Sequence, residues 1–141
     1  MIAKQLSVFI ENRKGRLGEV LKVLKNNDVN IMSLSLADTT EYGLLRLIVN
    51  KPEDGKKILS QEGFSTILTD VLIIKITHKA GSLQNLLTAI SDADIAVEYM
   101  YGLSIEGESA FVVVKASDNK KAIDVLKDCG VQTLSIEDLV K

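Results

Sequence analysis

The sequence contains one pattern twice, and this repeat constrains the fold more than any other feature. Residues 15–21 (GRLGEVL) and residues 81–87 (GSLQNLL), 66 positions apart, share a glycine followed by apolar residues at the same places. The same offset pairs Leu24 with Ile90, Val29 with Ile95, Ile31 with Val97, and the run 44–49 with the run 110–115. A period of this length is too long for a solenoid repeat and long enough for a small domain.

One extra residue enters the second copy after these runs, because Gly63 aligns with Gly130 at an offset of 67. We therefore predict two copies of one domain, residues 1–69 and 70–141. The chain has 141 residues, so each copy is near the lower size limit for an independent hydrophobic core. We expect the copies to share an interface, within the chain or between chains.

The composition excludes several classes of protein. Lys and Arg number 17 and Asp and Glu 19, a net charge of −2, and no basic cluster marks a nucleic-acid partner. No apolar stretch is long enough to span a membrane, and the first residues lack the apolar core of a signal peptide. Cys129 is the only cysteine, so no disulfide forms within the chain, and we expect a cytoplasmic protein. Because Cys129 ends an apolar helical stripe, we expect it in the core.

Within each copy, the hydrophobic periodicity predicts strand, helix, strand, strand, helix and strand. The first helix of each copy has apolar residues at spacing i, i+3, i+4 and i+7, which places them on one helix face. In the first copy we expect strands at 4–10, 30–37, 44–50 and 65–69, with a second helix that begins at Pro52 and ends before Gly63. In the second copy we expect strands at 71–77, 95–103, 110–116 and 132–136, and a last helix at 119–129.

Strand–helix–strand crossovers are right-handed in nearly all proteins. Two overlapping crossovers in a βαββαβ unit give an antiparallel sheet in the order 4-1-3-2, with both helices on one face. The predicted fold class is therefore α+β, with two ferredoxin-like domains whose sheets join edge to edge into eight strands. The other sheet face is then uncovered and strand two lies at an open edge, and both features favour a homodimer.

Ferredoxin-like folds have many functions, so the residues have to decide among them. An RNA-binding domain of this topology needs aromatic residues on strands one and three, where only Phe111 is suitable. A heavy-metal chaperone needs a CxxC motif in the first loop, which is absent. Asn12, Arg13 and Arg16 are the residue types of an acylphosphatase anion loop, but no Ser–His–Asp set, paired carboxylates or metal-ligand spacing accompanies them. We expect no enzyme activity, no metal and no cofactor.

Residues 11–31 resemble the opening signature of the ACT domain family, in which a polar loop and a glycine precede LxxVLxxL and a turn leads to an Asn-Ile pair. The matching residues are Asn12, Arg13, Gly15, Leu17, Val20, Leu21, Leu24, Asn30 and Ile31 in the first copy, and His78, Lys79, Gly81, Leu83, Leu86, Leu87, Ile90, Ile95 and Val97 in the second. The family's usual proline before the glycine is Lys14 and Ala80 here, and its Asn becomes Ala96 in the second copy.

The resemblance implies a regulatory protein that binds a free amino acid or a related small carboxylate and acts on a separate enzyme or transcriptional regulator. In that family, ligands lie where two domains pair through strand two. The chemistry agrees, because a glycine lets a ligand approach the backbone, free N–H groups at a helix start attract a carboxylate, and an Asn both donates and accepts. The expected ligand-binding residues are Asn12, Arg13, Gly15, Leu17, Asn30, Ile31, His78, Lys79, Gly81, Leu83, Val97 and Glu98.

These residues also have structural interpretations that the sequence leaves open. Gly15 and Gly81 are also typical of tight turns, and Asn30 is typical of the turn that ends a helix. His78, Arg13 and Lys79 are also consistent with side chains that are simply solvated. Tyr99 and Tyr101 are expected on one face of their strand. There they either cover the open sheet face in a contact between copies of the chain or form walls of the ligand site. A scaffolding domain pair without a competent ligand site is the alternative function. Because the side chain of Ala96 forms no hydrogen bond, we expect unequal sites, the one with Asn30 beside the Gly15 loop filling first.

Overall fold

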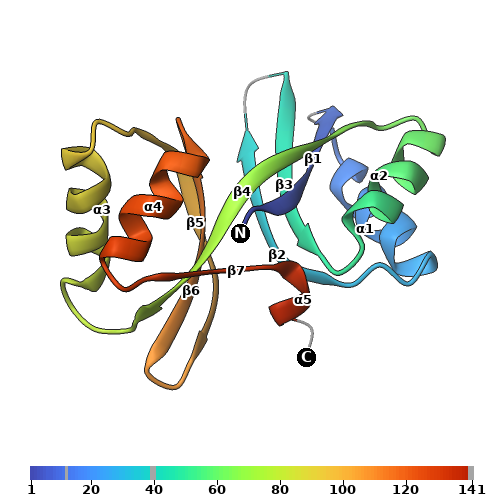
Figure 1. Ribbon diagram of the computed structural model, residues 1–141. Helices are drawn as coiled ribbons and strands as arrows, with labels where there is room; N and C mark the ends of the chain where they lie inside the picture. Colours follow the sequence, from blue (N-terminus) through green and yellow to red (C-terminus); the bar gives the residue numbers. More distant parts are fainter. Residues whose placement is uncertain (12, 39–40, 140–141) are drawn as a thin grey trace. The chain divides into compact units, whose positions relative to one another are not determined.

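The computed structural model describes residues 1–11, 13–38 and 41–139. The chain divides into two compact units, Lys4–Thr69 and Asp70–Lys141, and the second unit also includes Met1–Ala3 (Figure 1). The first residues group with the second unit because the Met1 amino group donates a hydrogen bond to Thr133 Oγ1 at 2.9 Å and Ile2 packs against that unit's core.

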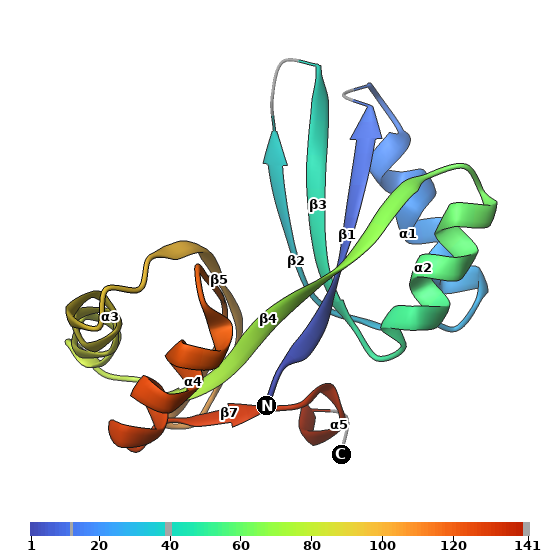
Figure 2. The same cartoon turned by 45° about the horizontal axis from the view of Figure 1, so that its top comes forward.

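The unit Lys4–Thr69 has the predicted βαββαβ order. Its elements are β1 (Ala3–Glu11), α1 (Arg16–Asn26), β2 (Ile31–Asp38), β3 (Tyr42–Val49), α2 (Pro52–Gln61) and the first part of β4 (Ser65–Thr77). The strands lie in the order β2-β3-β1-β4, the predicted 4-1-3-2, and both helices cover one face of the sheet (Figure 2). Pro52 is the first residue of α2 and Gly63 has a positive φ of 87° just after it, as expected for a helix start and a helix end.

The unit Asp70–Lys141 repeats this plan. It contains the rest of β4, then α3 (Ser82–Asp92), β5 (Val97–Glu106), β6 (Ser109–Ala116), α4 (Asn119–Asp128), β7 (Gln132–Leu134) and α5 (Ile136–Leu139). The strand order is β5-β6-β4-β7, again the predicted 4-1-3-2. The final strand is shorter than expected because the chain turns into α5 at Ile136.

The described residues form seven strands, not the eight that the sequence predicts. The strands expected at 65–69 and 71–77 are one continuous strand, β4, of 13 residues. Thr69 and Asp70 are polar but have extended backbone, so they do not interrupt it. The two sheets are therefore joined through a strand that belongs to both.

Each unit has its own apolar core between its helices and its sheet. Val20 and Leu24 of α1 and Leu86 and Ile90 of α3 are buried, as the helical spacing predicts. The prediction for Cys129 is wrong, because this residue is exposed. Since α4 ends at Asp128, Cys129 is the C-cap, where the chain turns away from the apolar face of the helix.

The structure also corrects the register of the repeat. Leu45 and Leu47 of β3 lie in the first core. The equivalent core residues of β6 are Val112 and Val114, which follow them by 67 positions in the sequence. Aligning 44–49 with 110–115 is therefore wrong by one residue, which would turn Phe111 toward the helices instead. The extra residue lies in a β-bulge of β5 between Gly102 and Ser104, since a bulge inserts one residue into one strand.

The sheet face away from the helices is only partly uncovered, contrary to expectation. Gln5, Ser7 and Ile48 are buried on it in the first unit. Gln5 Nε2 donates to Ser7 Oγ at 3.0 Å, and Ser7 Oγ is 3.1 Å from Thr69 Oγ1, so the buried polar groups have partners.

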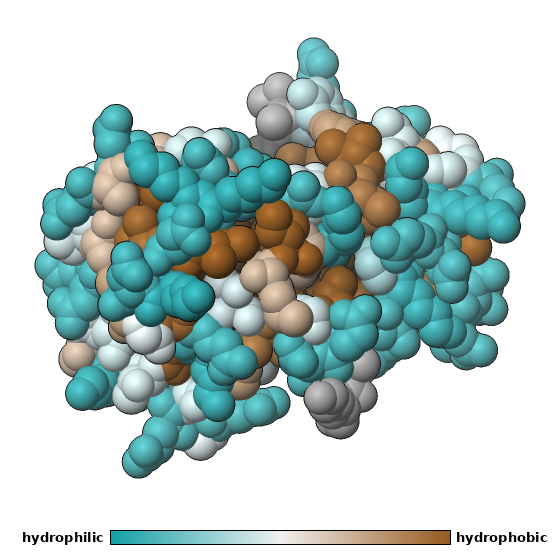
Figure 3. All heavy atoms as spheres, viewed as in Figure 1, coloured by the Kyte–Doolittle hydropathy of each residue, from teal (hydrophilic) through white to brown (hydrophobic). Residues whose placement is uncertain are grey.

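Apolar residues remain exposed on the same face near the end of β1. Phe9 and Tyr42 are 39% and 48% exposed, with ring centroids 6.4 Å apart. Figure 3 shows apolar side chains at the surface around this end of the strand. In the second unit, Tyr99 and Tyr101 pair with Lys115 and Val113, so they share one face of β5 as expected, and both are half-buried.

Candidate functional site

Each unit begins its first helix with a glycine in the same unusual conformation. Gly15 has φ 90° and ψ −14°, and Gly81 has φ 87° and ψ −17°, and each is the N-cap residue of its helix. A residue with a side chain loses roughly 1–2 kcal/mol in this left-handed region. Beyond the neighbouring residues in the chain, no heavy atom of the described residues lies within 4 Å of a Cβ built at either glycine, so the backbone conformation, and not crowding, requires glycine there.

The glycines leave N–H groups open at the helix starts. Neither glycine has a side chain that could cap its helix, and within the described residues no acceptor satisfies the N–H groups of Leu17 and Gly18, or of Leu83 and Gln84. The flanking N–H groups are satisfied: Arg16 and Glu19 donate to the carbonyls of Arg13 and Gly15, and Ser82 and Asn85 to those of Lys79 and Gly81. Each helix start therefore offers two adjacent donors with the positive end of the helix dipole behind them.

The charged residues of these loops face solvent. Arg13 Nε lies 2.9 Å from Glu11 Oε2 in an ion pair whose side chains are 56% and 69% exposed. His78 and Lys79 are exposed, and the backbone N–H of His78 donates to the Glu108 carbonyl at 2.6 Å. Asn12, also expected at this site, lies outside the described residues.

The apolar loop-side residues differ between the units. Leu17 is half-buried against the first core, whereas its counterpart Leu83 is 38% exposed.

The start of strand two is held in the same way in both units. The Asn30 N–H donates to Asn50 Oδ1 at 2.8 Å, and the Ala96 N–H donates to Ser117 Oγ at 3.0 Å. The side-chain amide of Asn30 is exposed and has no hydrogen bond within the described chain, so it is available to a ligand. Half-buried Ile31 and Val97 follow, and each begins a β-bulge, a feature frequent beside binding sites.

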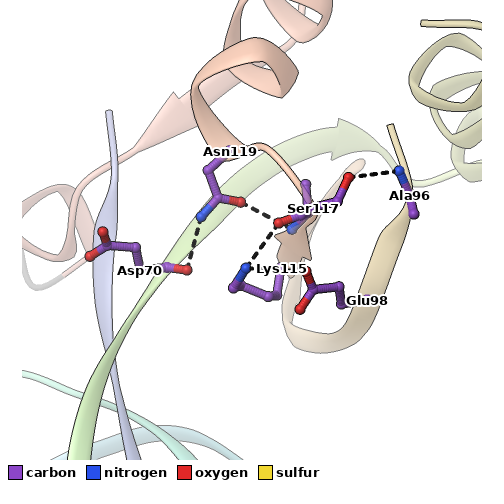
Figure 4. A network of polar contacts seen from close by, with 7 residues as sticks. Asp70, Ala96, Glu98, Lys115, Ser117 and Asn119 are labelled. Atoms are coloured by element: carbon purple, nitrogen blue, oxygen red, sulfur yellow. Dashed lines mark hydrogen bonds and ion pairs between the residues drawn. The ribbon is translucent and has the colours of Figure 1, made fainter. Parts of the chain in front are cut away.

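In the second unit, further polar contacts fix this region (Figure 4). Asn119 Oδ1 accepts from the Ala116 N–H at 3.0 Å, while Asn119 Nδ2 donates to the Asp70 carbonyl at 2.9 Å. Lys115 Nζ lies 3.6 Å from Glu98 Oε2. Glu98, an expected ligand residue, thus already has a cation beside it.

Gly15 and Asn30 do not lie beside each other within their unit, contrary to expectation. Gly15 precedes α1 and Asn30 follows it, and an 11-residue helix is about 16 Å long. Figure 2 shows α1 running from the end of β1 back to the start of β2. Asn30 instead lines a surface hollow of about 380 Å³ together with Leu21, Lys25, Asp28, Val29 and Ile31.

The supporting residues Asn50, Ser117 and Asn119 were not predicted from the sequence. All three follow the third strand of a copy, and only the repeat itself could have pointed to Asn50 and Ser117. Among the described residues, no group of three or more His, Cys, Asp and Glu side chains could hold a metal ion. No helix in the same part of the chain is long and apolar enough to cross a membrane.

Comparison with known proteins agrees with the observed fold. A family model described as an ACT domain pair matches residues 1–141. The crystal structure of protein BT0572 from Bacteroides thetaiotaomicron is 38% identical over 100% of this chain and 97% of that one, with a TM-score of 0.94. The ligand-free regulatory subunit of aspartate kinase from Thermus thermophilus is 13% identical, with coverage of 89% and 91% and a TM-score of 0.64, which shows a shared fold. No curated protein matches the chain.

Proposed function

The chain belongs to the ACT domain pair family, and we propose that it is a regulatory protein that binds a free amino acid or a related small carboxylate. The observation that carries this proposal is the pair of unsatisfied N–H groups behind each left-handed glycine. A carboxylate accepts hydrogen bonds from such a pair, and the helix dipole favours its negative charge. The open space in front of Gly15 and Gly81 leaves room for the approach.

A complete site needs a second domain, because Gly15 and Asn30 lie at opposite ends of α1. The edge strand β2 ends at the same end of the sheet as the Gly15 loop. If β2 pairs antiparallel with the edge strand of a neighbour, the start of the neighbour's strand comes alongside this loop. The Asn30 amide of one protomer would then meet an amino-acid ligand held by the helix start of the other.

The neighbour that we propose is a second copy of the chain. Leu34 and Leu36 are each 45% exposed on β2, on the side of the sheet that carries the helices. An edge strand with exposed apolar side chains favours pairing with another strand. The protein is thus proposed to act as a homodimer on a separate enzyme or regulator, without catalysis of its own. Its single cysteine is in keeping with the cytoplasm.

Thermal denaturation in the presence of each of the twenty amino acids and a set of small carboxylates tests the proposal. A ligand at 100 times its Kd stabilises the folded state by about 2.7 kcal/mol, which is readily measured for domains of this size. The absence of any shift would favour the scaffolding function, to which Ala96 in the second copy points. Chemical conversion of any of the compounds would overturn the non-catalytic assignment.

A further inference from the structure

The two units differ beside the start of the first helix. In the unit Lys4–Thr69, the Arg16 guanidinium stacks on the ring of Phe64, with Cζ 4.1 Å from the ring centroid. Arg16 Nη1 also lies 2.6 Å from Glu19 Oε2, and the Arg16 side chain is only 15% exposed. These three large side chains fill the space between α1, the end of β1 and the turn after α2.

The corresponding positions in the second unit hold smaller side chains. The repeat replaces Arg16 by Ser82, Glu19 by Asn85 and Phe64 by Val131. All three replacements line a hollow of about 320 Å³. The rest of its lining comes from Lys75, Ile76, Thr77, Leu86, Cys129 and Gly130. The hollow is therefore the space that the Arg16–Phe64 stack occupies in the first unit.

The lining of this hollow defines the chemistry of its occupant. Thr77, Ser82 and Asn85 offer two hydroxyls and an amide whose side chains have no hydrogen-bond partner among the described residues. Among the described residues, no Asp or Glu lines the hollow, and Ile76, Leu86 and Val131 supply an apolar wall. The two hydroxyls and the amide can each donate to an acceptor such as a carboxylate, and the apolar wall accommodates an aliphatic tail.

We propose that this hollow binds a short-chain aliphatic monocarboxylate, with the carboxylate toward Ser82 and Asn85 and the chain against Leu86 and Val131. The site lies within one unit and needs no neighbouring domain. It is separate from the amino-acid site proposed at the Gly15 loop and Asn30, and it adjoins the second helix start, where Ser82 and Asn85 flank the open N–H groups of Leu83 and Gln84.

Cys129 provides the assay, because it is the only cysteine, is exposed and lies on the rim of the hollow. The rate at which a thiol reagent such as Ellman's reagent labels Cys129 is measured against increasing sodium butyrate, with sodium chloride at equal ionic strength as the control. At ten times its Kd, butyrate should slow labelling about tenfold, because only the free fraction reacts. A rate that butyrate leaves unchanged would overturn the proposal.

Two variants test whether the hollow itself is responsible. Ser82→Arg combined with Val131→Phe restores the stack of the first unit and should abolish butyrate protection, whereas Thr88→Arg adds the same charge on α3 outside the hollow and should retain it. Asn85→Ala removes a donor without adding volume and should weaken butyrate binding about fivefold or more. Full protection of the stacked variant, with folding verified by circular dichroism, would refute the site. Asn30→Ala should leave butyrate protection unchanged, so a failure here is distinct from a failure of the amino-acid site.

Discussion

Replacing Gly15 by alanine tests the proposed link between backbone conformation and ligand binding. Gly15 has φ 90°, where alanine is less stable by roughly 1–2 kcal/mol. Alanine also reduces the entropy of the unfolded chain, which stabilises the folded state by about 0.4–1 kcal/mol. No atom lies within 4 Å of the added Cβ, so no steric term is added. We therefore expect Gly15→Ala to lower the unfolding free energy by about 1 kcal/mol.

Gly63 is a matched control within the same unit. Its φ is 87°, no described atom beyond its chain neighbours lies within 4 Å of its added Cβ, and its N–H donates to the Ser60 carbonyl, so it supplies none of the donors proposed to hold the ligand. Gly63→Ala should therefore lose the same unfolding free energy. Urea denaturation followed by circular dichroism measures both losses, and each corresponds to a midpoint shift of roughly 0.5 M.

Ligand binding should separate the two variants. Alanine at position 15 moves the N–H groups of Leu17 and Gly18 away from the geometry that accepts a carboxylate, so calorimetry should show weaker binding of the amino acid found in the thermal screen. Gly63→Ala should bind that ligand like the wild type. Equal weakening in both variants, or a Gly15→Ala protein as stable as the wild type, would refute the reasoning.

Three further predictions follow from the same geometry. Asn30→Ala should weaken ligand binding about five- to 150-fold in calorimetry while leaving the urea midpoint unchanged, because this amide has no partner in the described chain; unchanged affinity would exclude Asn30 from the site. Leu34→Lys should convert a dimer into the 15.4 kDa monomer in light scattering, since a charge on an edge strand opposes pairing, and a wild-type protein that is already monomeric would contradict this. Asn119→Ala should lower the unfolding free energy by about 1–3 kcal/mol in urea titrations, because it removes hydrogen bonds to Ala116 and Asp70, whereas Gln84→Ala should change it little, because the Gln84 side chain is exposed and has no hydrogen bond within the described residues.

The sequence by itself was sufficient to predict the repeated βαββαβ order and the sheet order 4-1-3-2. Both follow from hydrophobic periodicity, which is local, and from the handedness of crossovers, which is the same in nearly all proteins. The positive φ of Gly63 could also be predicted, because the position after a helix end favours glycine in this conformation.

Features that depend on contacts between residues far apart in the sequence could not be predicted without the fold. Whether β4 is one strand or two depends on strand pairing, which a polar pair such as Thr69-Asp70 does not reveal. The position of the extra residue in the bulge at Gly102–Ser104 required the pairing with β6, since a slip of one residue reverses the face of every side chain. Cys129 is exposed because the helix ends one residue earlier than its apolar pattern suggests.

The candidate site divides in the same way. Its residue types and its glycines are visible in the sequence, but the distance between Gly15 and Asn30 is not. Gly15 precedes α1 and Asn30 follows it, and a linear motif contains both without showing how far apart they are. The rise of the helix along its axis places them about 16 Å apart. The hollow beside Ser82 likewise becomes visible only when the Arg16–Phe64 stack of the other unit is seen in three dimensions, because packing joins residues that are 48 positions apart in the chain.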